Sequence, residues 1–321
     1  MYLHENRVNF RDIIEQVSNE NGRTPILVEK DYYVTLILKL LSEQLDNCVF
    51  KGGTSLSKGF RAIDRFSEDI DITFDEHIGE SRRKKLKNVV LKGISEELRM
   101  PIINWDSIQS DRDYNAYHFA YESVFGMEDD RLLQFVKLET ALGSYSFPTQ
   151  VVEIKNYIGD YLEARGKSDL AEQFSLNVFS MKLQALERTY IDKVFALCDY
   201  YLEGKSKRYS RHLYDIYKLT PMLTFDEVFD QLVQEVREHR SKMPICPSAQ
   251  DGVDVTAILL EFCNDDFYKE DYQAITSYFA ADYVPYEDTV AVIRKLAESE
   301  SWRTSEKLPI SSKRKNSKIG K

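Results

Sequence analysis

Two aspartates one residue apart, Asp69 and Asp71, lie in the short apolar stretch DIDITF of residues 69–74. Because side chains alternate faces along a strand, both carboxylates point to one face, about 7 Å apart, while Ile70 and Ile72 point to the other. Like charges at that range raise each other's pKa unless a cation lies near, and Mg²⁺ prefers oxygen ligands. The stretch therefore predicts a strand that presents a divalent metal site for Mg²⁺ or Mn²⁺.

A pair of glycines precedes this strand and supplies the second feature. The segment FKGGTSLSKGF (50–60) places Gly52 and Gly53 directly after the apolar run CVFK (48–51) and before a predicted helix. Glycines let phosphate oxygens approach backbone N–H groups at a helix start. Hydroxyl donors follow at Thr54, Ser55 and Ser57. Each feature alone also occurs in ordinary turns and strand edges, but together they favour a site that polymerises or transfers nucleotides.

A third acid of such a site usually comes from a separate strand, and Glu139 in QFVKLETAL (134–142) is the candidate. It alternates with Lys137, so both side chains face the same way. A cross-strand surface pair is the alternative explanation for these two residues.

The elements that position these residues are predicted to mix helices and strands up to about residue 180 and to be helical after it. Helical periodicity covers 5–20, 29–46 and a charged segment at 80–98. Three β-rich segments follow at 114–123, 132–142 and 150–156. The sheet is expected to end near residue 180, and the pattern from residue 181 is helical, with breaks at Gly204, Pro221, Pro244 and Pro285.

This order predicts an α+β fold: an N-terminal mixed sheet with flanking helices, followed by a helical C-terminal domain. The length of 321 residues allows two cores. We expect a catalytic domain at 1–180, a helical domain at 181–305 and a basic, disordered tail at 306–321.

Composition narrows the setting. The chain is 43% hydrophobic and 30% charged, which predicts a folded protein. The longest apolar stretch, YYVTLILKLL (32–41), is interrupted by Thr and Lys and is too short to span a membrane. The N-terminus lacks a secretion signal, so a cytoplasmic protein is expected. The four cysteines show no metal-binding or disulfide spacing and are expected to be buried thiols.

The net charge of −10 argues against a uniformly basic surface for nucleic acid. Basic residues nevertheless cluster without acids at 81–92, at 204–214 and in the last fifteen residues. Solvated helix faces and a disordered end would explain these runs equally well. If RNA is a substrate, the expected contacts are Lys84, Lys85, Lys87, Lys207, Arg208 and Arg211.

The chain resembles the AbiEii/AbiGii (MenT-like) toxins of the DNA polymerase β-type nucleotidyltransferase superfamily. The resemblance rests on VEKDYYVTLIL (28–38), FKGGTSLSKGF (50–60), RFSEDIDITF (65–74) and RTYIDKVFALCDYYLEGKSKRYSRHLYDIYKL (188–219). It covers roughly the first two thirds of the chain, and the last hundred residues carry no recognised motif.

The resemblance implies a toxin of a toxin–antitoxin or phage abortive-infection system, an antiviral defence with an antitoxin encoded nearby. The implied reaction is metal-dependent transfer of a nucleotide from an NTP to the 3′ end of tRNA, which blocks translation. By motif position, Asp69 and Asp71 match the metal-binding aspartates, and Gly53 and Ser55 fall in the phosphate-binding turn. Lys193 and Asp215 match the family's basic and acidic catalytic residues.

Three further residues have two explanations each. Lys30 and Asp31 also match a family motif, although packing of their helix against the sheet would account for them equally well. His212 has the pKa range of a general base, but beside Arg211 and Tyr214 it is expected to pack or to contact phosphate.

Two other functions remain open. The same site could carry out a kinase-like phosphoryl transfer or a nucleotidyl transfer to a protein hydroxyl. The protein could also be a catalytically idle module that binds an NTP and holds a partner protein or RNA. The intact metal motif argues against the idle module.

Overall fold

A computed structural model of the chain describes residues 1–65, 67, 69–126, 134–143, 145–276 and 282–302. The expected tail at 306–321 lies outside the described residues. Six strands are described: β1 Cys48–Lys51, β2 Ile70–Phe74, β3 Tyr114–Ala120, β4 Phe135–Ala141, β5 Thr149–Ile154 and β6 Phe179–Gln184. The helices of the first half are α1 Arg7–Asn21, α2 Pro25–Gln44, α3 Gly52–Lys58, α4 Glu80–Lys85, α5 Lys92–Glu97, α6 Tyr157–Glu163 and α7 Ser168–Gln173. Those of the second half are α8 Leu186–Leu202, α9 Arg211–Leu219, α10 Glu227–Ser241, α11 Val255–Asn264, α12 Lys269–Asp271 and α14 Tyr286–Ala297.

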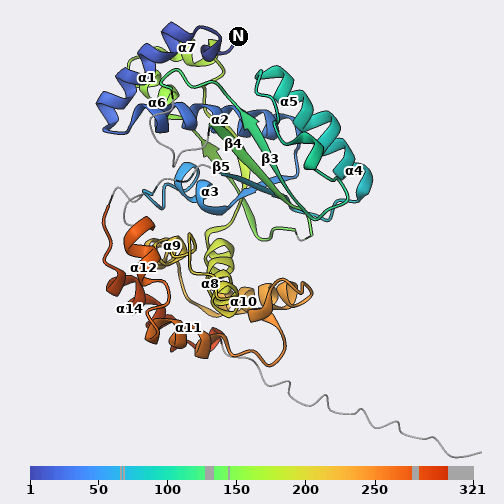
Figure 1. The fold of residues 1–321 in the computed structure, drawn as a ribbon, viewed down its shortest axis with the longest axis vertical. Coiled ribbons are helices and arrows are strands. Elements are labelled where there is room, and N and C mark those ends of the chain that lie inside the picture. Colours follow the sequence, from blue (N-terminus) through green and yellow to red (C-terminus); the bar gives the residue numbers. More distant parts are fainter. Residues whose placement is uncertain (66, 68, 127–133, 144, 277–281, 303–321) are drawn as a thin grey trace, which may run out of the picture.

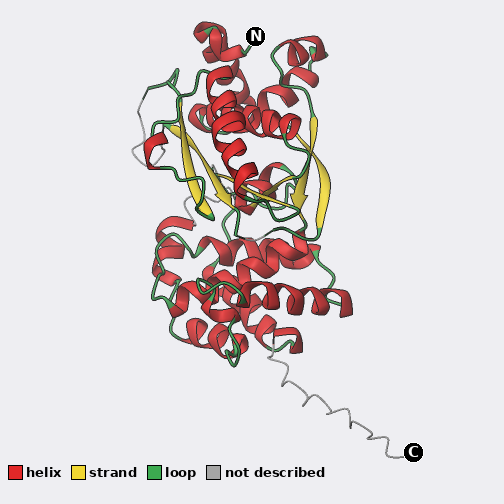
Figure 2. Cartoon of the chain, turned by 90° about the vertical axis from the view of Figure 1, so that its right-hand side faces the viewer, coloured by secondary structure: helices red, strands yellow, loops and turns green. Residues whose placement is uncertain are grey.

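In the described part of the chain the strands form one mixed sheet in the order β3-β4-β2-β1-β6-β5. The centre combines an antiparallel pair, β1 with β2, with two parallel pairs, β1 with β6 and β2 with β4. The expected α+β fold with a mixed sheet is therefore confirmed. Figure 1 shows the sheet and helices α1 to α7 in one half of the molecule and helices α8 to α14 in the other, and Figure 2 shows the strands enclosed by helices.

The long helix α2 is buried along most of its length, and this burial holds the sheet in place. It starts after Thr24 with Pro25 in its first turn, where a missing N–H costs nothing. Its apolar residues, among them Leu36, Ile37 and Leu41, are at most 1% exposed. The predicted helix at 29–46 is thus confirmed, although it begins four residues earlier than its sequence pattern indicated.

The predicted end of the sheet near residue 180 is wrong. Residues 181–184, which were assigned to the helical half, continue β6. Met181 and Leu183 are buried and alternate with the less buried Lys182, which is the period of a strand and not of a helix. Leu183 pairs with Phe50 of β1, so contact with a distant strand decides the conformation.

The buried residues form two apolar clusters. One lies between the sheet and helices α1 to α7, and the other lies among helices α8 to α14. The second also includes Leu56, Ala62 and Ile63 from the first half of the chain. This segment joins the two clusters, and β6 crosses residue 180, so the domain boundaries proposed from sequence stay a prediction.

Two simpler expectations agree with the structure. All four cysteines are free and buried. Two of the predicted helix breaks fall at helix boundaries: Gly204, with φ of 68°, follows the end of α8, and Pro285 is the N-cap of α14. Among the described residues, no helix has the length and apolar content that would be needed to cross a bilayer.

Candidate active site

A cleft of about 340 Å³ lies between the end of the central strands and helices α8, α9 and α10. It brings together the predicted acids, the glycine pair and the predicted basic residue from the helical half. Among those lining it are Gly52, Gly53, Asp69, Asp71, Glu139 and Lys193. Residues separated by more than a hundred positions thus surround one space.

The strand register aligns charged side chains across three neighbouring strands. Lys51 of β1 is opposite Asp71 of β2, and Asp71 is opposite Glu139 of β4. Paired residues in adjacent strands point to the same face, so these three side chains stand in a row. Asp69, just before β2, has Lys137 Nζ 3.4 Å from its Oδ2 atom. The predicted third acid, Glu139, therefore lies beside the predicted aspartate pair.

A lysine offsets part of the negative charge of this carboxylate row. Burial, and then the neighbouring carboxylate of Glu139, raise the pKa of Asp71 to about 7. Desolvation opposes ionisation of Glu139, but hydrogen bonds from Asp71, Lys137 and Tyr114 hold its pKa below the usual value. The ammonium of Lys137 lies 2.5 Å from Glu139 Oε1. The acids are thus close enough to require a cation.

Gly52 and Gly53 are required by this close packing. Gly52 has φ of 80°, and a Cβ atom built on it would lie 2.0 Å from Asp71 Oδ2. A Cβ atom on Gly53 would lie 2.7 Å from Arg65 Nη2. The glycine pair therefore lets the turn approach Asp71 on one side and the buried Arg65 on the other.

The three hydroxyl groups after the glycines do not line the cleft. Ser55 Oγ donates to Gly52 O at 2.8 Å and is fully buried. Thr54 Oγ1 is 2.9 Å from Ser67 Oγ, and Ser57 Oγ donates to Thr54 O at 3.2 Å. These hydrogen bonds hold the turn in shape, and nucleotide binding by the three hydroxyls stays a prediction.

Lys193 and Asp215, predicted to act together, form a buried ion pair of 2.6 Å. Arg65 makes a second pair with the same carboxylate through two hydrogen bonds, of 2.6 and 2.7 Å. Desolvation opposes ionisation of Asp215, but Arg65 and Lys193 hold its pKa far below the usual range. Desolvation lowers the pKa of Lys193, while Asp215 opposes that shift. Lys193 lines the cleft, so Asp215 acts as its anchor.

Sequence reasoning missed Arg65, although it starts the segment RFSEDIDITF. A lone arginine 150 positions from its partner gives no local sign of pairing. Lys51 was also missed. Its side chain lines the cleft and makes no hydrogen bond or ion pair with any residue that the structure describes.

His212 lines the cleft with its Nδ1 atom 3.4 Å from Lys193 Nζ. Desolvation, and then the charges of Lys193 and Arg211, lower its pKa well below the usual value. The imidazole is therefore neutral near pH 7. Both expected roles of His212, packing and contact with phosphate, stay predictions.

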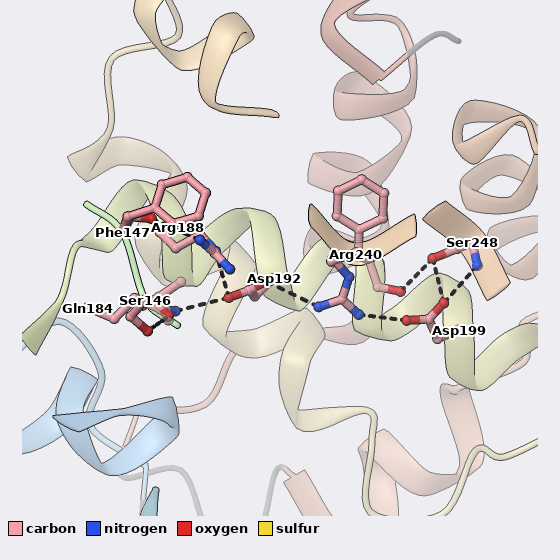
Figure 3. A network of polar contacts seen from close by, with 10 residues as sticks. Ser146, Phe147, Gln184, Arg188, Asp192, Asp199, Arg240 and Ser248 are labelled. Atoms are coloured by element: carbon pink, nitrogen blue, oxygen red, sulfur yellow. Dashed lines mark hydrogen bonds and ion pairs between the residues drawn. The ribbon is translucent and has the colours of Figure 1, made fainter. Parts of the chain in front are cut away.

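A polar network closes the other side of the cleft and joins the two halves of the molecule (Figure 3). Asp192 of α8 is its centre: it accepts from Gln184 of β6 at 3.1 Å, from Arg188 at 3.1 Å and from Arg240 of α10 at 3.1 Å. Arg240 also donates to Asp199 at 2.7 Å. These contacts fix α8 and α10 to the end of β6.

Lys30 and Asp31 lie outside this cleft. They line a larger neighbouring cavity of about 590 Å³, where Asp31 pairs with Lys58 and accepts from the backbone N–H of Tyr157. Arg65 and Ser67 line both spaces. Other cations of the larger cavity also have carboxylate partners, such as Arg23 with Asp64 at 2.8 Å. This pairing favours the structural explanation of Lys30 and Asp31.

Of the six basic residues predicted to contact RNA, only Arg211 lines the cleft among the residues described. Lys84 pairs with Glu80 on the surface of α4, and Lys87 donates to Ile108 O at 2.7 Å. Figure 1 shows α4 in the half that holds the sheet and α9 in the helical half. The remaining residues, Lys85, Lys207 and Arg208, are exposed, and their role stays a prediction.

The glycine geometry leads to a direct test. Gly52→Ala should lower the transfer rate by about 100-fold, because the new methyl group displaces Asp71 and misplacement by about 1 Å is enough for such a loss. Gly22→Ala is the matched control, since Gly22 has φ of 65° but nothing within 4 Å of the added Cβ. Both variants should lose about 1 kcal/mol of stability from backbone strain. Equal transfer rates in the two would contradict the contact with Asp71.

A mixed sheet that carries adjacent acids, a glycine turn and a buried lysine across one cleft is typical of nucleotidyltransferases. Residues 37–298 match the family model described as "Nucleotidyl transferase AbiEii toxin, Type IV TA system". The match covers most of the chain, and the protein belongs to this family of nucleotidyltransferase toxins. Membership of a nucleotidyltransferase family implies an NTP substrate, and membership of a toxin–antitoxin system implies an antitoxin.

One solved structure, the MenT4 nucleotidyltransferase toxin Rv2826c from Mycobacterium tuberculosis H37Rv, is similar at 16% sequence identity with a TM-score of 0.48. The similarity covers 89% of this chain and 88% of that chain. No curated protein sequence matches the chain.

Proposed function

We propose that the protein transfers a nucleotide from an NTP to an RNA acceptor, the 3′ end of tRNA, and thereby blocks translation. One observation supports the transfer chemistry. Asp71 is opposite Glu139 in the neighbouring strand and packs against Gly52, and all three residues line a cleft that Lys193 also lines. The RNA acceptor is supported by the resemblance to MenT-like toxins and by the exposed basic residues near α9.

A divalent metal fits the chemistry of the carboxylate row. Asp69, Asp71 and Glu139 offer only oxygen donors, which suits Mg²⁺ or Mn²⁺. Within the described residues no three such side chains are already arranged around one point, because Lys137 lies between Asp69 and Glu139. Burial and the neighbouring Glu139 raise the pKa of Asp71, so a cation beside these two carboxyl groups would be favoured. These three residues would hold the metal, which supplies charge neutralisation for the phosphates.

The chain's own residues have separate roles in the proposed reaction. Gly52 and Gly53 admit the triphosphate close to the backbone, and Lys193 binds it as a compact charge whose direction is set by Asp215. The acceptor hydroxyl attacks the α-phosphorus, a new P–O bond forms, and the bond to the β-phosphate oxygen breaks. Pyrophosphate leaves, and the hydroxyl proton is released to solvent. Catalysis then consists of positioning and charge stabilisation.

The decisive experiment incubates the protein with Mg²⁺, total RNA and each NTP labelled in turn at the α- or the γ-phosphate. Nucleotidyl transfer to tRNA places α-label, and no γ-label, on a tRNA band. Gamma-label on protein would indicate the kinase-like alternative, and α-label on protein would indicate a protein hydroxyl acceptor. Nucleotide binding without pyrophosphate release would identify an idle binding module.

The proposed RNA-binding residues are tested by a double substitution. Lys207→Gln with Arg208→Gln should weaken RNA binding about tenfold at all acceptor sequences, because phosphate contacts position RNA without reading bases. The slope of log affinity against log salt should flatten by about 1 for each cation that is neutralised. NTP binding should not change. Affinity is measured by a salt titration of filter binding or fluorescence anisotropy.

Lys92→Gln with Arg99→Gln provides the matched control. Both side chains are exposed. Arg99 matches Arg208 in backbone conformation, because both have a positive φ, of 53° in Arg99 and 70° in Arg208. This control should retain wild-type RNA affinity. If the variant with both Lys207 and Arg208 replaced also retained wild-type RNA affinity throughout the titration, the proposal of an RNA acceptor would lose its support. A protein acceptor would then be favoured.

A further inference from the structure

The cleft changes in character along helix α8. Residues that line it recur at helical spacing on one face of α8, at Thr189, Asp192, Lys193, Ala196 and Tyr200. The first three are polar or charged and face the metal-site end. The last two are apolar or aromatic.

Two side chains from other elements complete the apolar end. Met243, which follows α10, and His212 of α9 line the same cleft as Ala196 and Tyr200. His212 is neutral near pH 7 because desolvation lowers its pKa. This end therefore offers a thioether, a methyl group and two uncharged aromatic rings, which suit a planar, uncharged ring, and Arg211 and Arg240 line the same cleft.

Neighbouring rings fix the orientation of Tyr200. Its ring is stacked on that of Tyr209, with centroids 3.6 Å apart and planes at 19°. The His212 ring is parallel to it within 4°, with centroids 6.1 Å apart. Tyr200 is half-buried and lines the cleft, so a prearranged aromatic surface adjoins the space that Ala196 leaves free. A rigid aromatic surface loses little side-chain entropy on binding.

The spacing from the phosphate-binding lysine suits a nucleotide. Tyr200 is seven residues beyond Lys193, which is about two helical turns or roughly 10 Å along α8. A sugar and its phosphates occupy a comparable length, so a triphosphate at Lys193 and Gly53 brings the attached base to the apolar end.

We propose that Tyr200, with Ala196, His212 and Met243, forms the subsite that binds the nucleobase of the donor NTP by stacking. The inference rests on the proposed nucleotidyl transfer and adds to it the place where the base is recognised. Stacking on an aromatic ring tolerates any base, so Tyr200 supplies affinity, while the rim of the subsite discriminates among bases.

The test compares NTP with inorganic tripolyphosphate, which has the phosphates but no base. Binding of each to the full-length protein is measured by calorimetry with Mg²⁺ and without RNA, which excludes a contribution from an acceptor base. Tyr200→Ala should weaken binding of the preferred NTP about tenfold or more and leave tripolyphosphate binding unchanged. Tyr200→Phe should bind both as the wild type does.

Tyr201→Ala is the matched control, because it removes the same ring from the same turn of α8 but outside the cleft, where Tyr201 packs on Phe262 and Phe267. It should retain NTP affinity. Ala196→Leu is an independent variant that fills the space beside Ala196 without removing a ring. It should also weaken the binding of NTP and leave the binding of tripolyphosphate unchanged. It decides the matter if Tyr200→Ala does not fold.

The outcomes separate the two proposals. Wild-type protein that binds no NTP would refute the proposed function itself. Wild-type protein that binds NTP, with unchanged affinity in Tyr200→Ala or in Ala196→Leu, would refute only the base subsite. Equal losses of NTP and tripolyphosphate binding would also refute it, because the residues would then act on the phosphates.

Discussion

Asp69→Ala and Asp71→Ala should each lower nucleotide transfer by about 1,000-fold or more, because each removes an oxygen donor from the row expected to hold the metal. The fold should persist in both variants. Removing Asp71 leaves Glu139 paired with Lys137 and bonded to Tyr114. Transfer of α-label to RNA and relief of growth inhibition measure the loss, and thermal unfolding measures the fold.

Asp75→Ala is the matched control for this pair. Asp75 follows the C-terminal end of β2, whereas Asp69 precedes its N-terminal end. The two side chains are similarly exposed, Asp75 at 28% and Asp69 at 24%. It pairs with Lys182 at 2.6 Å, away from the cleft. Its loss should leave transfer unchanged. Transfer near the wild-type rate in Asp69→Ala or Asp71→Ala would rule out the assignment of the metal site.

Lys193→Ala should also abolish transfer, since it removes the buried ammonium that lies between Asp215 and the cleft. Lys193→Arg should restore little activity, because a planar fork does not replace a compact charge in a space fitted to lysine. The fold should tolerate Lys193→Ala, because Arg65 continues to neutralise Asp215 through two hydrogen bonds. Single-turnover transfer rates and melting temperatures test both statements.

Asp215→Ala provides the contrast that separates catalysis from stability. It leaves the buried cations Arg65 and Lys193 without their shared carboxylate, and losing one partner of a buried pair costs about 3–5 kcal/mol. Its melting temperature should therefore fall well below that of Lys193→Ala. If Lys193→Ala were fully active, Lys193 would be a structural residue that neutralises Asp215.

Local sequence patterns were sufficient to place most elements near the site. The segment CVFK forms β1 as expected, and DIDITF forms β2 from Ile70. Alternation predicted that Lys137 and Glu139 share a face, and both side chains meet the metal-site acids. These predictions succeed because strand alternation and glycine preference are properties of a few adjacent residues.

Other features were missed because they depend on distant partners. Residues 181–184 resemble the start of a helix until β1 pairs with them. The hydrogen bonds that the hydroxyls of Thr54 and Ser55 make within the turn could not be read from the sequence. The basic runs indicated RNA contacts by composition, and only Arg211 among those residues reaches the cleft in the described structure.

The sequence by itself therefore determined the class of chemistry: the paired acids, the glycine turn and the order of strands and helices are all encoded within short segments. Tertiary structure alone decided that Lys51, Asp71 and Glu139 stand in one row, that Arg65 and Lys193 share Asp215, and that an aromatic end adjoins the charged one. The physical reason is that local conformation depends on neighbouring residues, whereas charge pairing and cleft shape depend on how separate elements pack. Burial in that packing is also what shifts the pKa values of Asp71, Lys193 and His212.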